Sequence, residues 1–164
     1  MKINLGCGKD IRKGYINVDC INSKGVDKIC DLNKKLPFKN NSVKEVVLQD
    51  IIEHIDNVPK FLLNLWDVCS PDAKIFIRAP HFTSRNVWSD LEHKRGYNWD
   101  SFQTNQYIVD KFLVVKKRIT FSRIKKIFEP IFNKIPRVYE SWLRFPTAAN
   151  LEVELKVIKP MEKL

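Results

Sequence analysis

The first nineteen residues constrain the fold more than any other part of the chain. Residues 2–5 form a short apolar segment, residues 6–10 a turn with two glycines, and residues 15–18 a second apolar segment that ends on Asp19. This order of parts is found where a doubly wound α/β sheet holds a nucleoside. Glycines let the backbone bend sharply and approach a ligand, and the acid can accept hydrogen bonds from ribose hydroxyls. The alternative is a tight turn followed by a surface aspartate.

Hydrophobic patterns along the rest of the chain predict further strands and one long helix. The apolar run 46–48 suits a buried parallel strand. Residues 58–69 repeat apolar side chains at helical spacing after Asn57, a favourable N-cap. Residues 151–158 alternate apolar and charged side chains, as a half-exposed antiparallel strand does. We expect seven strands in a largely parallel sheet, at residues 2–5, 15–18, 26–30, 43–48, 74–79, 112–121 and 151–158.

Length and composition indicate one soluble domain. We expect this domain to span residues 1–164, with loop and helical insertions at about 81–107 and 122–147. No apolar run approaches a membrane span and no signal-peptide pattern is present, so we expect a cytoplasmic protein. The net charge of +10 favours an anionic partner such as nucleic acid, a phosphorylated metabolite or an acidic glycan. The four cysteines lack CxxC spacing, so we expect free thiols and no metal site.

Five stretches, taken in order, resemble the class I S-adenosylmethionine-dependent methyltransferases, and among them the group called type 11. Residues 4–8 (Asn-Leu-Gly-Cys-Gly) are similar to the first motif of that family, and residues 15–19 to its second strand with the ribose acid. Residues 30–38 are similar to the stretch that passes the adenine, and residues 49–55 (Gln-Asp-Ile-Ile-Glu-His-Ile) to the segment after the fourth strand. Residues 69–73 stand where the family usually has a Lys-Pro-Gly-Gly turn.

The resemblance implies a Rossmann-like α/β fold: a seven-stranded, mostly parallel sheet with one antiparallel edge strand and helices on both faces. It also implies S-adenosylmethionine as the cofactor. The glycine turn would face the methionine part, Asp19 the ribose and Asp31 the adenine amino group, with Gln49 and Asp50 near the sulfonium. By matching position, the cofactor contacts would be Gly6, Cys7, Gly8, Asp19, Cys20, Asp31, Leu32, Gln49 and Asp50.

The chain departs from the family pattern between its first two strands. Only nine residues, 6–14, join them, whereas a parallel crossover usually needs a dozen or more and often contains a helix. We expect that helix to shrink to about one turn, so that Lys9 or Arg12 takes over the contact with the carboxylate of the cofactor. No helix is predicted before residue 2, so we expect the 81–100 loop or a partner subunit of a homo-oligomer to cover the cofactor.

Two of the three histidines, His81 and His93, are the candidate catalytic residues. His81 directly follows the fifth predicted strand, at the edge where ligands bind in such sheets, and Pro-His-Phe at 80–82 matches some type 11 relatives. A general base helps when an oxygen or nitrogen acceptor loses a proton. We therefore expect His81 or His93 to be that base or an acceptor contact. The alternatives are a structural cap for His81 and an exposed loop position for His93, and we expect His54 to orient the loop.

These motifs leave the methyl acceptor open. We expect a small-molecule or glycan acceptor that is anionic or carries a sugar or base. The positive charge suggests an RNA methyltransferase as the alternative enzyme, although residues 49–52 replace an Asn-Pro-Pro-Tyr motif. The alternative from another class is a non-catalytic module that binds S-adenosylmethionine or a nucleotide.

Overall fold

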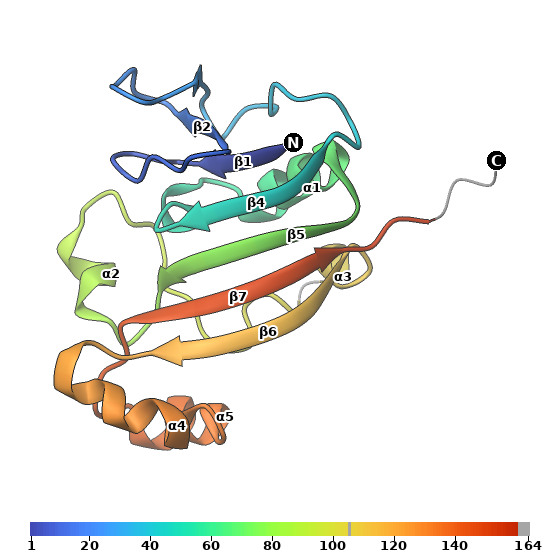
Figure 1. The fold of residues 1–164 in the computed structure, drawn as a ribbon. Helices are drawn as coiled ribbons and strands as arrows, with labels where there is room; N and C mark the ends of the chain where they lie inside the picture. The colour runs from blue at the N-terminus through green and yellow to red at the C-terminus, as the bar shows by residue number, and fades with distance from the viewer. Residues whose placement is uncertain (105, 161–164) are drawn as a thin grey trace.

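A seven-stranded sheet runs through the computed structural model, which describes residues 1–104 and 106–160. Its strand order is β3-β2-β1-β4-β5-β7-β6 (Figure 1). The strands are β1 (Lys2–Leu5), β2 (Ile16–Asp19), β3 (Lys28–Ile29), β4 (Val43–Gln49), β5 (Cys69–Pro80), β6 (Phe112–Thr120) and β7 (Asn150–Val157). Neighbouring strands from β3 to β5 are parallel, and β7 is antiparallel to both β5 and β6. The mostly parallel α/β sheet is confirmed, with the reversed strand one place in from the edge.

Apart from the helix predicted over residues 58–69, the helices are short. The side chain of Asn57 caps that helix by accepting a hydrogen bond from the Lys60 amide at 3.0 Å. The predicted 81–100 loop contains a helix, α2. The α-helices are α1 (Val58–Val68), α2 (Arg85–Ser89), α3 (Gln106–Val109), α4 (Glu129–Phe132) and α5 (Pro136–Val138), with 3₁₀ turns η1 (Ile52–His54) and η2 (Arg123–Phe128) and a π turn, η3 (Tyr139–Leu143). No helix among the described residues is long and apolar enough to cross a bilayer.

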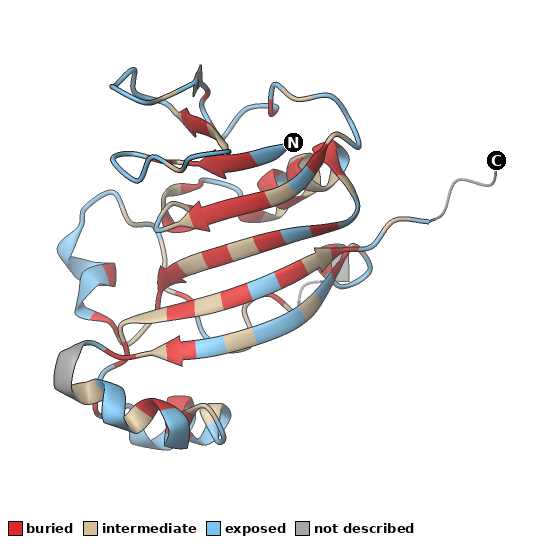
Figure 2. Ribbon diagram, viewed as in Figure 1, coloured by how far each residue is buried: buried red, intermediate tan, exposed pale blue. Residues whose placement is uncertain are grey.

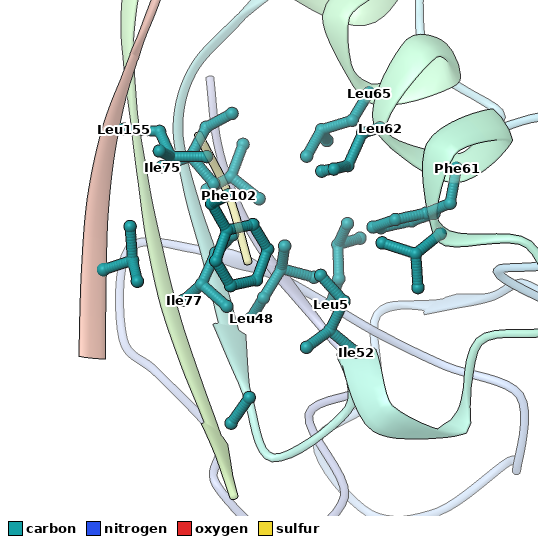
Figure 3. Packing of buried hydrophobic residues seen from close by; sticks show 14 of the residues in the cluster. Leu5, Leu48, Ile52, Phe61, Leu62, Leu65, Ile75, Ile77, Phe102 and Leu155 are labelled. Carbon is teal, nitrogen blue, oxygen red and sulfur yellow. The ribbon is translucent and has the colours of Figure 1, made fainter. Parts of the chain in front are cut away.

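The core lies between α1 and one face of the sheet. Phe61, Leu62 and Leu65 repeat at helical spacing, and all three are buried. Figure 3 shows them pointing from α1 toward side chains of β1, β4 and β5, among them Leu5 and Ile77. Burying each such side chain contributes about 1.5–3 kcal/mol, so this layer fixes the position of the strand ends.

The helices cover one face of the sheet only, within the part of the chain that the structure describes. Strands β4, β5 and β7 cross the near side of Figure 1 with no helix in front of them, and burial alternates along β7 and over residues 73–79 of β5 (Figure 2). On β5, Ile75 and Ile77 are buried while Lys74 is exposed. The expectation of helices on both faces is not met in this region, because the connections over residues 6–15, 20–27 and 30–42 contain no helix. The first two are shorter than the dozen or more residues that a helical crossover usually needs.

Candidate functional site

The glycine turn after β1 adopts a backbone that requires glycine. Gly6 and Gly8 have φ of +64° and +48°, in the left-handed region that glycine enters without strain. A Cβ atom on Gly6 would also collide with the side chain of Ile51. Between them, the buried Cys7 donates its amide hydrogen to the Val18 carbonyl at 3.0 Å, which ties the turn to β2.

Two buried asparagines hold the loop that the sequence predicts to contain a helical turn. Asn4 Nδ2 donates to the Asp10 carbonyl at 2.6 Å and to Asn17 Oδ1 at 3.1 Å. Asn17 Oδ1 also accepts the Arg12 amide hydrogen at 2.9 Å. Residues 6–15 contain no helix, so these side-chain contacts replace one. Sequence reasoning did not assign a role to either asparagine, although a polar residue in the middle of two apolar strands was a visible signal.

The predicted ribose acid faces the glycine turn. Asp19 Oδ2 accepts the Gly8 amide hydrogen at 2.8 Å, and Oδ1 accepts that of Ile21 at 3.0 Å. Each carboxylate oxygen keeps acceptor capacity for a further donor. Cys20, beside it, is exposed. The structure thus brings Gly6, Gly8 and Asp19 together at one edge of the sheet.

The next predicted contacts lie at the same edge, where the parallel strands end. Asp31 follows β3, its side chain is 45% exposed, and its Oδ1 accepts the Asn33 amide hydrogen at 2.9 Å. Leu32, next to it, is buried. Gln49 ends β4, and its Oε1 accepts from Arg12 at 2.9 Å. Arg12 also donates to Asp10 Oδ2 at 2.8 Å, so two protein oxygens orient its guanidinium at this edge, where it keeps further donors.

Asp50 follows Gln49 in an unusual conformation and carries an ion pair. Its φ is +52°, and its carboxylate accepts hydrogen bonds from Arg78 Nε at 3.0 Å and from the terminal nitrogen of the same guanidinium. This pairing raises the pKa of Arg78. Asp50, paired in this way with Arg78, also lines a large pocket.

The pocket has a volume of about 770 Å³ and opens at the ends of β4 and β5. It is lined by residues that follow β4, by the end of β5, by the start of β7 and by the segment around α2. Its lining residues are Asp50, Glu53, Arg78, Pro80, Asn86, Ser89, Asp90, Leu91, Glu92, His93 and Asn150. A pocket of this size at the carboxyl ends of parallel strands is where ligands of open α/β sheets bind.

The structure separates the two candidate histidines. His93 lines the pocket, whereas His81 is fully buried and does not. His81 Nδ1 accepts the Thr83 amide hydrogen at 3.2 Å, so the opposite ring nitrogen, Nε2, carries a proton and donates it to Glu140 Oε1 at 3.0 Å. Glu140 Oε1 also accepts the Trp99 amide hydrogen at 2.7 Å. These contacts give His81 the geometry of a core histidine.

Sequence reasoning missed Glu53 as a site residue. Its side chain is 1% exposed and lines the pocket, and neither carboxylate oxygen has a hydrogen-bond partner. Burial raises the pKa of Glu53 to about 7. His93 Nε2 lies 3.8 Å from Glu53 Oε1 and 3.7 Å from Asp90 Oδ2. The only sequence signal was the Glu-His pair at 53–54, directly after the fourth strand.

The strand order is that of the fold of the class I S-adenosylmethionine-dependent methyltransferases. A SAM-dependent methyltransferase from Archaeoglobus fulgidus superposes with a TM-score of 0.68 at 18% identity, over 94% of this chain and 85% of that one. A chain from the structure of the Haloferax volcanii Trm112 methyltransferase activator in complex with a methyltransferase superposes with a TM-score of 0.66 at 13% identity, over 96% of this chain and 82% of that one.

A third neighbour shows that the fold leaves the reaction open. The [4+2]-cyclase SpnF superposes with a TM-score of 0.60 at 12% identity, over 97% of this chain and 74% of that one. No family model and no curated protein matches the sequence. At these identities the likeness concerns the fold, and the function has to be argued from the site.

Proposed function

We propose that this protein is an S-adenosylmethionine-dependent methyltransferase. The observation that carries the proposal is the convergence of the glycine turn, Asp19 and the end of β4 at one edge of a sheet with the methyltransferase strand order. Binding would use the nine positions already matched to the family: Gly6, Cys7, Gly8, Asp19, Cys20, Asp31, Leu32, Gln49 and Asp50. When bound, S-adenosylmethionine supplies an activated methyl group.

The pocket beyond Asp50 would hold the methyl acceptor. Methyl transfer is an in-line displacement, so the main task of the protein is to hold two partners in line, which can contribute about 7–11 kcal/mol. Of the two histidines we proposed for proton transfer or acceptor contact, His93 lies in the pocket and His81 lies in the core. We therefore assign His93 to the acceptor and give His81 the role of positioning the segment behind it.

The lining of the pocket bears on the chemistry of the acceptor. Four carboxylates, those of Asp50, Glu53, Asp90 and Glu92, contribute to it, and the one arginine among its described lining residues, Arg78, is paired with Asp50. Such a lining repels a free anion and accepts hydrogen bonds from hydroxyl groups. We therefore favour a hydroxyl-bearing acceptor such as a sugar over a bare phosphate.

Isothermal titration calorimetry with S-adenosylmethionine and S-adenosylhomocysteine tests the cofactor assignment. We expect both to bind, and Asp19→Asn to weaken binding tenfold or more, because each hydrogen bond to a charged group is worth about 1.5–3 kcal/mol. Asp110→Asn is the matched control, since Asp110 is exposed beside the start of β6, at the opposite edge of the sheet. No binding of either compound, or equal binding by the Asp19 variant, would contradict the proposal. Binding without methyl transfer to any acceptor would indicate a non-catalytic module.

A further inference from the structure

Three potential metal-ligating side chains meet at the wall of the acceptor pocket, two of them, Glu53 and His93, among its lining residues. Glu53, His54 and His93 each offer one ligand atom, and these atoms all lie within 4.8 Å of one another. Glu53 and His54 belong to η1, directly after β4, whereas His93 follows α2. The Lys94 amide donates to the Glu53 carbonyl at 3.0 Å and so holds the two segments together.

Glu53 is the least explained polar group in the described part of the molecule. It is buried, and both of its oxygens lack a hydrogen-bond partner. Its near neighbour His93 Nε2, at 3.8 Å, is too far away for a hydrogen bond. A buried, unpaired carboxylate costs several kcal/mol, so its presence indicates that a cation or donor outside the chain completes this environment.

His93 has the orientation of a ligand. Its Nδ1 lies 3.0 Å from the Asn86 carbonyl oxygen, which can only accept, so Nδ1 carries a proton. In the neutral ring, Nε2 then bears a lone pair and faces the carboxylates of Glu53 and Asp90. Histidines that bind metals through one nitrogen commonly donate the other N–H to a backbone carbonyl in this way.

We propose that Glu53, His54 and His93 bind a divalent first-row transition-metal cation. One carboxylate and two imidazoles suit Zn²⁺, Fe²⁺ or Co²⁺ better than Ca²⁺ or Mg²⁺. Zn²⁺ bonds of about 2.0–2.2 Å at tetrahedral angles place two ligand atoms about 3.3–3.6 Å apart. His93 Nε2 and Glu53 Oε1, at 3.8 Å, therefore have to close by a few tenths of an ångström, and a pair at the outer limit of 4.8 Å by about 1 Å. Asp90 lies outside this cluster, with its Oδ2 3.7 Å from His93 Nε2 and its side chain half-exposed at the mouth of the pocket, so the fourth coordination position stays open.

A bound cation would change what the pocket recognises. It would offset the carboxylates that line the pocket and leave a coordination position for an oxygen of the acceptor, whose proton it would acidify. This consequence rests on the proposed methyltransferase function, whereas the metal site itself does not. Measuring metal and S-adenosylhomocysteine binding on the same samples therefore separates the two proposals.

The test uses the full chain, stripped of metal with a chelator that is then removed. We expect calorimetry to show one Zn²⁺ per chain, and Co²⁺ to give visible absorption bands of a protein-bound ion. Glu53→Gln and His93→Ala should each weaken Zn²⁺ binding at least tenfold while S-adenosylhomocysteine affinity stays near wild type. Without metal, Glu53→Gln should melt no lower than the wild type, because it removes a buried charge. Zn²⁺ should raise the melting temperature of the wild type and not that of Glu53→Gln.

Two controls separate this site from adventitious binding. Glu92→Gln removes a carboxylate from the same loop outside the cluster and should leave Zn²⁺ affinity unchanged. Cys20→Ser removes the exposed thiol and should do the same. The proposal is overturned if the wild type binds neither Zn²⁺ nor Co²⁺. It is also overturned if the Cys20 variant, rather than the Glu53 and His93 variants, loses the binding.

Discussion

Replacing His81 with alanine should lower the free energy of unfolding and leave the residues that line the pocket in place. The imidazole is fully buried, and its Nε2 donates to Glu140 Oε1 at 3.0 Å. Removing the ring would leave a nearly buried carboxylate whose remaining polar contact is the Trp99 amide, at 2.7 Å. A cavity would also form against Phe82 and Tyr139, whose rings lie 4.7 and 5.9 Å from the imidazole.

The size of the effect follows from the loss of one partner of a buried pair. Breaking a buried charged pair costs about 3–5 kcal/mol, and here the Glu140 carboxylate keeps the Trp99 amide as a donor while the lost ring leaves a cavity. For a chain of this length, 1 kcal/mol corresponds to about 2–4 °C in melting temperature. His81→Ala should therefore melt about 6–20 °C below the wild type.

Urea unfolding followed by circular dichroism measures this directly, together with calorimetric binding of S-adenosylhomocysteine. The double variant His81→Ala/Glu140→Ala should be less destabilised than the sum of the two single variants, because it removes both partners. The reasoning is refuted if His81→Ala unfolds within about 1 kcal/mol of the wild type and the protein loses methyl transfer. In that case His81 would act on the substrate.

Three further predictions concern the turn, the core and the thiols. Gly6→Ala should abolish S-adenosylhomocysteine binding and lower stability, because its Cβ would collide with Ile51. Gly14→Ala has a φ of +82° but open space around it, so it should cost only the backbone strain. Calorimetry measures the binding of the two variants, and urea unfolding measures their stability. Leu62→Ala should cost about 2–5 kcal/mol of unfolding free energy in urea, because the side chain is fully buried against the sheet. Burial raises the pKa of Cys69 to about 12, so this thiol should resist alkylation at pH 8, while mass spectrometry should find exposed Cys20 labelled first.

The order of the elements and the turn chemistry could be predicted from local sequence. Asn57 as the N-cap of α1 and the strand ending on Asp19 were visible because each depends on neighbouring residues. Helix α2 was missed because its five residues are too few to show a hydrophobic period. The sequence predicted about one helical turn in the first crossover because so few residues join the two strands, and the structure has no helix in residues 6–15.

The site was harder to predict because it depends on which way side chains face. Along β5, Ile75, Ile77 and Ala79 point into the core, and His81 follows at the same parity. This alternation was the signal that His81 lies on the buried side. Glu53 gave no comparable signal, since its isolation from donors depends on α2 and His93, some 40 residues away. Such tertiary contacts lie outside any local pattern.

The uncovered face of the sheet has a consequence for the thermodynamics of the whole chain. Parallel strands are normally buried on both sides, but here Lys74 and Glu154 face away from the core. A sheet covered on one side buries less apolar surface per residue than one between two helical layers. The dependence of unfolding free energy on urea and the heat capacity of unfolding both scale with that surface. Per residue, we expect urea titration to give a smaller slope, and calorimetry a smaller heat capacity of unfolding, than three-layered proteins with this strand order give.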